Sequence, residues 1–565
     1  MQSRLLRNSP SIILASAFAL FISFAAPSPA QSQEKISSDS LFSADRISSI
    51  EIDIPQKDWD FIRQQSRSFS ESLGKKTAES PFEYVRGDVT IDGRKIEDVG
   101  IRKKGFLGSL SVERPSLKLK FDKYKDQDPI EGVDRLTLNN NKQDPSRVCQ
   151  YLSYKLFRES GTRSSRCGFA RVSVNGKYLG IYSNVESVKP LFLEREFGDG
   201  TGDCFEGTIT DFFPDWVKKF EAKNKKASYE DLKQVATALA LPEPDLDQLN
   251  ELLNLEAFIQ FWAMESLIGF WDGYCSNQNN FFVYQNPSDS KFYFIPWGTD
   301  SAFTTSSPIP PYRIRPKSVH AKAILPNKLY RIPEIQSQYS ETLNKFLDEH
   351  WNESRLLSEM DRLQTMLKEH AMPSNSKFST SMTSIRSFIK NRRQSLLREF
   401  KDGPPELNSR EKKPIYFAET GNVKITFSTQ WFNQSPNKKS PVGDAQVEFS
   451  KNGKPISLSN VSVYAEQSKA PSRNKNKPPT IVITGKDQDS GNSLTIAVSI
   501  SSENFKPSEN NKVSVTGLFL VNGVFMPSQM EMIDGTAILD SASTEPGAPV
   551  AGRLELKIKK MKLSD

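Results

Sequence analysis

Two aspartates and a group of asparagines are the residues of this chain whose types and order suit chemistry on phosphate. Asp272 and Asp300 stand on either side of the group formed by Asn277, Asn279 and Asn280. Phosphoryl transfer needs a carboxylate to orient the attacking hydroxyl and oxygen ligands to hold Mg²⁺ at the phosphates. Protein kinases supply these parts as a loop aspartate, then an asparagine and, after a short hairpin, a second aspartate. The order is the same here, but Asp and Asn are also ordinary turn residues, so a purely structural role stays open.

Other catalytic chemistries find less support in the sequence. The chain has three histidines, which are scattered at positions 320, 350 and 370, and the last two lie in polar helical sequence. This scatter argues against a histidine relay or a zinc site. The sequence contains neither a G-x-S-x-G motif nor a Walker P-loop.

The elements that position the aspartates follow from hydrophobic spacing. Residues 215–270 are predicted to be helical and end in a helix that is too apolar to be exposed. The polar loop "WDGYCSNQNN" comes next, and "FFVYQ" and "KFYFIPW" are predicted to be two buried strands. Asp272 therefore lies in a loop before a hairpin, and Asp300 directly after it. Two further helical stretches are predicted, around 338–370 and 379–401.

The region before this helix is predicted to be rich in strands. Hairpin turns are expected at Asp92-Gly93 and at Asn175-Gly176, because these pairs favour the tight turns of hairpins. The segment "PSLKLKFDKY" alternates, which places Lys118 and Lys120 on one face of a strand. A single helix is predicted over 145–160.

The chain changes character at residues 403–414, which are predicted to be a linker. Beyond it, over 415–565, short alternating segments are separated by Gly, Asn, Pro and Ser turns. This pattern predicts an all-β, sandwich-like domain. The fold class is thus α+β for residues 48–402, followed by an all-β domain.

The first thirty residues have the features of a signal peptide. Arg4 and Arg7 precede an apolar run, and the small residues of "APSPA" follow it. The run is too short for a membrane span, and no later stretch reaches the ~20 apolar residues that a span needs. We expect no transmembrane segment after cleavage, a flexible Ser-rich lead over 31–47, and a secreted, periplasmic or cell-surface protein.

Net charge bears on nucleic acid binding, and cysteine content bears on disulfides and metal sites. The formal net charge of +7 is a weak excess for 565 residues and does not favour binding to a nucleic acid polymer. An exported chain permits disulfides, and four thiols allow three pairings among Cys149, Cys167, Cys204 and Cys275. No C-x-x-C spacing occurs, so disulfides or free buried thiols are favoured over a metal site.

The segment "FWDGYCSNQNNFFVYQNPSDSKFYFIPWGTDSAF" resembles the signature of the CotH family, spore coat protein H-like proteins. In that family a W-D-x-Y loop, an Asn before an aromatic strand and F-x-P-W-x-x-D recur. Other pieces follow in the family's order, so that the resemblance covers residues 48–402: "VGIRKKGFLGS", "RPSLKLKFDKY", "DRLTLNNNKQDPS", "VNGKYLGIYSNVESVKPLFLEREF" and "FIKNRRQSLLREF". It implies an atypical protein-kinase-like fold that binds ATP and Mg²⁺ and phosphorylates Ser/Thr hydroxyls of exported protein substrates.

The resemblance also implies roles for single residues. Asp272 would be the catalytic carboxylate, Asn280 the loop asparagine that holds metal, and Asp300 the principal Mg²⁺ ligand. Asn277 fits the kinase spacing between the aspartate and the asparagine, whereas Asn280 fits the family context. Gly298 stands where many relatives have an acid, which leaves fewer carboxylates for a second metal ion.

The resemblance also implies which residues would bind the nucleotide. Lys118 would pair with its phosphates, and Lys120 on the same strand face is the alternative. Glu186 is the candidate for the glutamate that pairs with this lysine, and a structural salt bridge is the other explanation for it. Gly105 and Gly108 are candidates for a phosphate-covering loop, although a plain turn between strands explains them as well.

Two other functions remain open on the sequence. One is a catalytically inactive CotH-like structural or adhesion protein whose β domain does the binding, which Gly298 and the scarcity of ATP outside the cytoplasm favour. The other is a carbohydrate-binding or carbohydrate-active protein, suggested by the β domain and its Trp431. No pair of acids suited to glycoside hydrolysis is identifiable, so this second possibility ranks below the first.

Overall fold

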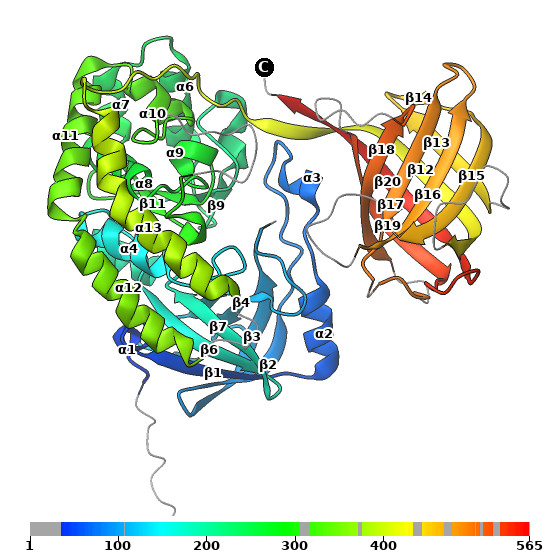
Figure 1. Ribbon diagram of the computed structural model, residues 1–565, viewed down its shortest axis with the longest axis horizontal. Helices are drawn as coiled ribbons and strands as arrows, with labels where there is room; N and C mark the ends of the chain where they lie inside the picture. Colours follow the sequence, from blue (N-terminus) through cyan, green and yellow to red (C-terminus); the bar gives the residue numbers. More distant parts are fainter. Residues whose placement is uncertain are drawn as a thin grey trace, which may run out of the picture.

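The structure is a computed structural model that describes residues 35–106, 108–305, 316–370, 376–432, 443–467, 477–502, 504–508, 512–523 and 531–563. The predicted signal peptide, residues 1–30, lies outside this part of the chain. Figure 1 shows a barrel, a helical part above it, and a separate β domain on the other side of the molecule. The predicted fold class, α+β followed by an all-β sandwich-like domain, is confirmed.

The first seven strands close into a barrel in the order β1-β2-β3-β4-β5-β7-β6. Both predicted hairpins are present, and Asp92-Gly93 and Asn175-Gly176 have the positive φ angles that such tight turns require. The bounds are β1 (Ile47–Asp53), β2 (Val85–Ile91), β3 (Arg94–Lys104), β4 (Ser116–Lys120), β5 (Arg135–Asn139), β6 (Cys167–Val174) and β7 (Lys177–Val185), with helices α1 (Ser38–Phe42), α2 (Gln56–Gln64) and α3 (Phe69–Ser72) beside them.

Part of the expected flexible lead is structured. Helix α1 buries the side chains of Leu41 and Phe42. The amide Nδ2 of Asn184 donates a hydrogen bond to the carbonyl of Leu41 at 3.1 Å, and the guanidinium of Arg166 lies over the Phe42 ring. Two buried apolar side chains therefore anchor a segment whose Ser-rich composition suggested flexibility.

The helical part surrounds a small sheet of order β11-β10-β8-β9. Helix α8 is buried on nearly all sides, as its apolar composition predicts. The bounds are α4 (Cys149–Glu159), α5 (Pro190–Phe197), β8 (Cys204–Gly207), η1 (Pro214–Lys219), β9 (Glu221–Ala222), α6 (Glu230–Ala240), α7 (Leu246–Leu252), α8 (Leu255–Leu267), α9 (Tyr274–Asn277), β10 (Phe281–Gln285), β11 (Phe292–Pro296), η2 (Thr299–Ser301), α10 (Ile324–Leu329), α11 (Pro333–Glu349), α12 (Glu353–Lys368) and α13 (Ser376–Glu399).

The helical stretch predicted over 338–370 is divided into α11 and α12. The second helix begins after Asn352, whose side-chain oxygen accepts a hydrogen bond from the Arg355 amide at 2.9 Å and caps the N-terminus of α12. Trp351, the residue before this cap, is fully buried. An N-cap asparagine inside a long helical pattern therefore marks the boundary between two helices.

The C-terminal domain is all-β and encloses its own apolar core. Strand β12 pairs with β20 as well as with β13 and β15, so the sheet closes on itself. Trp431 is buried in this core against Phe505 and does not form an exposed platform for a sugar. The bounds are β12 (Ile415–Phe432), β13 (Asp444–Lys451), β14 (Lys454–Pro455), β15 (Leu458–Gln467), β16 (Pro479–Asp487), β17 (Ser493–Ser499), β18 (Val513–Val521), β19 (Glu531–Ser541) and β20 (Pro549–Leu563).

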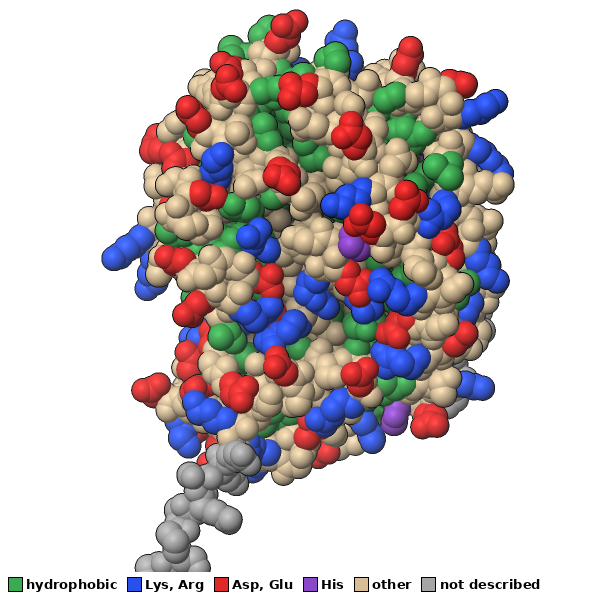
Figure 2. All heavy atoms as spheres, turned by 90° about the vertical axis from the view of Figure 1, so that its left-hand side faces the viewer, with side chains coloured by type: hydrophobic (Ala, Val, Ile, Leu, Met, Phe, Trp, Pro, Cys, Tyr) green, Lys and Arg blue, Asp and Glu red, His purple; other side chains and the backbone are tan. Residues whose placement is uncertain are grey.

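The four cysteines are free, buried thiols and form no disulfide with one another. Of the two alternatives that the sequence left open, disulfides or free buried thiols, the structure therefore has free buried thiols. Within the described residues, no helix is both long and apolar enough to cross a membrane. On the face formed by the helical part and the barrel, acidic and basic side chains are interspersed (Figure 2), in keeping with the small net charge.

Candidate active site

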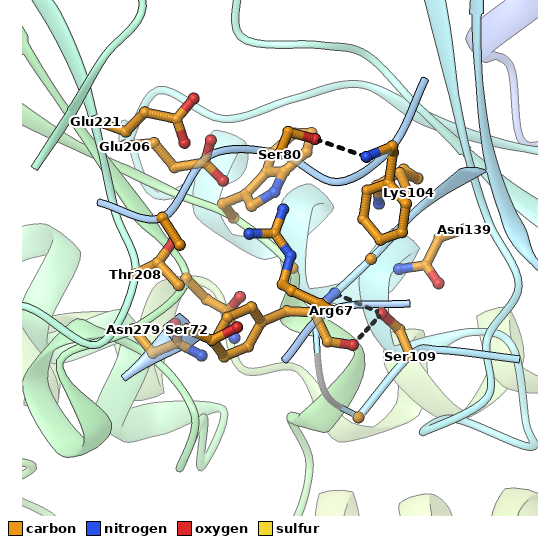
Figure 3. A pocket seen from close by; sticks show the side chains of 18 of the residues that line it. Arg67, Ser72, Ser80, Lys104, Ser109, Asn139, Glu206, Thr208, Glu221 and Asn279 are labelled. Atoms are coloured by element: carbon orange, nitrogen blue, oxygen red, sulfur yellow. Dashed lines mark hydrogen bonds between the residues drawn. The ribbon is translucent and has the colours of Figure 1, made fainter. Parts of the chain in front are cut away.

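A polar cavity of about 270 Å³ lies between the barrel and the helical part (Figure 3). Strands β3 and β4 line one side of it, and the loops that follow α8 and β11 line another. Of the residues predicted for the site, the cavity brings together Gly105, Gly108, Lys118, Asp272, Asn280 and Asp300. Segments far apart in the sequence thus meet at one place.

Buried Glu265 at the end of α8 fixes the loop that carries Asp272. The Glu265 carboxylate accepts hydrogen bonds from the backbone amides of Tyr274 and Cys275, at 3.0 and 2.8 Å. Burial raises the pKa of Glu265 to about 8. A Cβ on Gly273 would lie 2.2 Å from Glu265 Oε1, so only glycine fits beside the carboxylate. Glu265 is not predicted as a site residue from the sequence, although a charged residue inside an apolar helix is the signal that could have found it.

The asparagine group surrounds the Asp272 carboxylate. Side-chain amides donate to it from Asn277 at 2.7 Å, Asn279 at 3.2 Å and Asn280 at 3.0 Å. Burial raises the pKa of Asp272, and these three donors act in the opposite direction. Asn279 and Asn280 line the cavity, whereas Asn277 does not. The three amides therefore fix the direction in which the carboxylate points.

Asp300 lies in η2, directly after the hairpin, and is 7% exposed. Burial, followed by the nearby charges of Asp272 and Asp144, raises the pKa of Asp300 to about 7. In the described part of the chain, no Lys, Arg or His lies within ion-pair distance of its carboxylate. Two neighbouring carboxylates of raised pKa are the arrangement that a bound divalent cation stabilises.

The donor set around Asp300 fits Mg²⁺ bound together with phosphate. Mg²⁺ usually takes one or two carboxylates and completes its octahedron with water and substrate phosphates. Here Asp300 offers a carboxylate oxygen and Asn280 an amide oxygen, and the Asp272 carboxylate is hydrogen-bonded to Asn280. The described residues contain no group of three or more His, Cys, Asp or Glu side chains suited to a metal, so the remaining ligands have to come from elsewhere.

Gly298 is packed against the side chain of Asn280. Gly298 and Asn280 both have φ near +55°. A Cβ built on Gly298 would lie 2.7 Å from Asn280 Oδ1. An acid at this position, which the resemblance leads one to expect, does not fit unless Asn280 moves. The site therefore combines Gly298 with a close asparagine where many relatives have a carboxylate.

Replacing Gly298 by Ala is expected to destabilise the protein more than the matched change Gly176→Ala. Both glycines have positive φ, which costs an alanine about 1–2 kcal/mol, but Gly176 has no atom within 4 Å of a built Cβ. The contact with Asn280 should add roughly 1 kcal/mol to the effect at Gly298. Chemical denaturation of both variants checks this, and equal losses of unfolding free energy would contradict the packing argument.

The cavity carries more basic than acidic side chains. Six basic residues face four acids: Arg67, Arg102, Lys104, Lys118, Lys219 and Lys223 against Glu206, Glu221, Asp272 and Asp300. Burial and the charges of Arg102 and Lys104 hold the pKa of Lys118 well below its ordinary value. A cluster of cations that repel one another is stabilised by a polyanion such as a polyphosphate.

Two predicted residues lie elsewhere. Lys120 does not line the cavity, and its ammonium pairs with Asp122 at 2.6 Å and Asp134 at 3.7 Å. Glu186 pairs with Arg166 at 2.8 Å and Arg195 at 2.5 Å, which is the structural salt bridge that was the alternative for it.

The acid whose charge acts on Lys118 is Glu206 of β8, not Glu186. Burial alone would raise the pKa of Glu206, but the charges of Lys223, Lys118 and Lys104 lower it. Glu206 also forms an ion pair with Lys223. No motif in the sequence around Glu206 distinguishes it from other strand residues, so only the fold reveals it.

The glycines after β3 allow close packing at the edge of the cavity. A Cβ on Gly105 would lie 2.6 Å from Ser109 Oγ, and one on Gly108 would lie 2.5 Å from Gln143 Oε1. Figure 3 shows Arg67, from the segment after α2, extending into the cavity between Glu206 and Lys104. Arg67 lies in sequence without a recognisable motif and was not predicted.

A family model described as CotH kinase protein matches residues 101–396. Inner spore coat protein H of Bacillus subtilis (strain 168) is 23% identical over 289 residues, which is 47% of this chain and 78% of that protein. Spore coat protein homolog 1 of Rhizopus delemar is 21% identical over 180 residues, 29% of this chain and 30% of that protein. Invasin CotH2 of Rhizopus delemar is 22% identical over 206 residues, 32% of this chain and 34% of that protein.

The chain spans about a third of the length of these two Rhizopus relatives. The matched residues 101–396 include every cavity residue from Arg102 to Asp300 and cover just over half of the chain. They end before β12, so the C-terminal β domain lies outside the match. The chain belongs to the CotH kinase protein family.

Proposed function

We propose that this protein transfers the γ-phosphoryl group of ATP, with Mg²⁺, to Ser/Thr hydroxyls of secreted or surface proteins. The observation that carries the proposal is the meeting of Asp272, Asn280 and Asp300 at one cation-lined cavity. Membership of the CotH kinase protein family supports the proposed transfer, and the coat and invasin names of its relatives support the proposed class of surface substrates. They also support a location outside the cytoplasm or at the cell surface.

The basic side of the cavity is the proposed site of the triphosphate. Lys104 and Lys118 extend from neighbouring strands that pair in register, and Arg102 lies directly opposite Lys118. A fixed cation next to a phosphate forms a charge-assisted hydrogen bond, about twice as strong as a neutral one. Mg²⁺ held by Asp300 and Asn280 would neutralise charge on the phosphate oxygens.

Asp272 is the proposed acceptor of the hydroxyl proton. Its carboxylate is held by three amide donors, so a free lone pair can point at a substrate hydroxyl without a loss of orientation. As the hydroxyl oxygen forms its bond to the γ-phosphorus, the bond from that phosphorus to the bridging oxygen of ADP breaks. The hydroxyl proton passes to Asp272, and ADP leaves with the bonding electron pair.

The experiment that tests the proposal is a transfer assay with the full chain. Purified protein is incubated with Mg²⁺ and ATP labelled at the γ position, together with a Ser/Thr-rich acceptor protein, alongside Asp300→Ala. Label incorporated by the parent and not by the variant supports the kinase. Absence of label from both, together with no nucleotide binding, favours the inactive structural or adhesion protein.

Removing the charge of Lys118 is expected to weaken nucleotide binding. Lys118→Met should raise KM for ATP by roughly 10- to 100-fold, because one charge-assisted hydrogen bond is lost. Lys120→Met is the matched control, since Lys120 lies on the same strand but outside the cavity. Steady-state kinetics with labelled ATP measure both, and an equal effect of the two variants would contradict the assignment.

A further inference from the structure

The residues between α13 and β12 run along the helical part and are bound to it. Leu407 is buried, and the carbonyl of Pro405 accepts a hydrogen bond from Tyr330 Oη at 3.0 Å. The carbonyl of Ser409 accepts from Asn327 Nδ2 at 3.0 Å and from Arg331 at 2.8 Å. We call residues 405–413 the strap. Figure 1 shows it crossing the top of the helical part toward β12.

The strap reaches the catalytic loop through Lys412. The Lys412 ammonium donates to the side-chain oxygen of Asn277 at 2.8 Å and to its backbone carbonyl at 3.2 Å. Gln278 Nε2 in turn donates to the carbonyl of Lys412 at 2.6 Å, and the Lys412 amide donates to the Lys322 carbonyl at 2.7 Å. The loop and the strap are thus bound to each other by side chains from both.

These contacts determine which way the Asn277 amide points. A lysine ammonium only donates hydrogen bonds, and an ionised carboxylate only accepts them. With its oxygen held by Lys412, Asn277 must turn its NH₂ group toward Asp272, to which it donates at 2.7 Å. Without Lys412 the Asn277 oxygen loses its cationic partner, so the amide that donates to Asp272 is held less firmly in position.

Two acids face Lys412 from the elements around it. Asp272 and Asp211 both attract its charge, and the charge of Lys412 also stabilises the ionised form of Asp272. Asp211 is held by Tyr274 Oη at 2.9 Å, Gln278 Nε2 at 2.8 Å and the Ile324 amide at 2.7 Å. Lys412 therefore lies where it can hold the loop by charge as well as by hydrogen bonds.

We propose that Lys412 is a positioning residue for phosphoryl transfer, which orients Asp272 through Asn277. The inference rests on the proposed function and goes beyond the family match, which ends at residue 396. It makes the chemical step depend on the segment that joins the two domains. Nucleotide binding, in contrast, is assigned under the proposed function to the cavity cations of β3 and β4, Lys104 and Lys118.

The test uses full-chain variants in the labelled-ATP assay. Lys412→Met should lower kcat by roughly 10- to 100-fold, because misplacement of a reacting group by about 1 Å costs about that much. KM for ATP should stay within about twofold of the parent, and Lys412→Arg, which keeps the charge, should recover at least part of the lost kcat. Lys413→Met is the matched control, because Lys413 is adjacent in sequence but exposed, whereas Lys412 is partly buried.

Each other result has a definite meaning. A parent without transferase activity defeats the proposed function, whereas an active parent with an equally active Lys412→Met overturns this inference alone. Equal losses for Met and Arg, or a KM that rises as much as kcat falls, would assign Lys412 a merely structural role. Hydrogen exchange of residues 274–280 should be faster in Lys412→Met than in Lys413→Met, and unchanged exchange overturns the inference whether or not the parent is active.

Discussion

Replacing Asp300 by Asn is expected to reduce phosphoryl transfer by ~10³-fold or more and, at the same time, to stabilise the metal-free protein. Activity should fall because the amide that replaces the carboxylate lacks the negative charge that holds Mg²⁺ at the phosphates. Stability should rise because the buried carboxylate of Asp300 has neighbouring acids and, in the described structure, no cation within ion-pair distance. Opposite changes in activity and stability would mark Asp300 as a functional residue.

The pH dependence of stability follows from the same carboxyl. Its pKa is about 7 in the folded protein and 3.8 in its ordinary state, so the folded state binds more protons between these values. The contribution of this carboxyl to stability is therefore greatest below pH ~4 and falls as pH rises to about 7, by up to ~4 kcal/mol at ~1.4 kcal/mol per pKa unit. In Asp300→Asn this part of the slope should be absent, whereas the contribution of buried Glu265, whose pKa is also raised, should remain.

Thermal unfolding from pH 5 to pH 8 without metal measures the effect, and exposed Asp215→Asn serves as the control. Mg²⁺ with ATP should raise Tm of the parent and leave Asp300→Asn unchanged, because a ligand stabilises only the state that binds it. A variant that melts below the parent at pH 8, or that still transfers label at the parental rate, would contradict this account of Asp300.

Replacing Asp272 by Asn is expected to lower kcat by roughly 10²- to 10⁴-fold while binding of Mg-ATP persists. General-base catalysis contributes about this much, and an amide cannot accept the hydroxyl proton. Unlike Asp300→Asn, this change should not stabilise the protein. One end of the new amide would be an NH₂ group facing donors, since Asn277, Asn279 and Asn280 all donate to the carboxylate.

The measurements are single-turnover transfer of label and calorimetric titration with a nonhydrolysable ATP analogue. Lys120→Met is a suitable control, because Lys120 lies outside the cavity. A kcat within tenfold of the parent would remove Asp272 from the proposed chemistry. Loss of analogue binding together with kcat would instead make it a binding residue.

Short-range pattern predicted much of what surrounds the site. Local hydrophobicity predicts the buried helix α8, the polar loop after it and the hairpin β10-β11. The order of Asp272, Asn280 and Asp300 along these elements is read directly from the sequence. The tight turn at Asn175-Gly176 follows from local backbone preference. These features depend on neighbours in sequence, which is the information that a single chain contains.

The rest depends on contacts between distant segments. The alternation of apolar and polar residues predicts strands but not their pairing, so it does not predict that β1 pairs in parallel with β6 and closes the barrel. It also does not predict which acid lies near Lys118. Glu186 was the candidate partner of the nucleotide-binding lysine, but it pairs with two arginines. Glu206 is the acid that interacts with the cavity lysines instead. Lys412 lies in a segment that was predicted to be a linker, and only tertiary packing brings it to Asn277.

The most direct test is diffraction from crystals of the full chain grown with Mn²⁺ and a nonhydrolysable ATP analogue. An anomalous peak bonded to Asp300 and Asn280, with the triphosphate along Lys104 and Lys118 and its last phosphate facing Asp272, is the predicted result. A metal ion bound by other residues, or a cavity that stays closed to the nucleotide under saturating conditions, would contradict the proposal of phosphoryl transfer at this site.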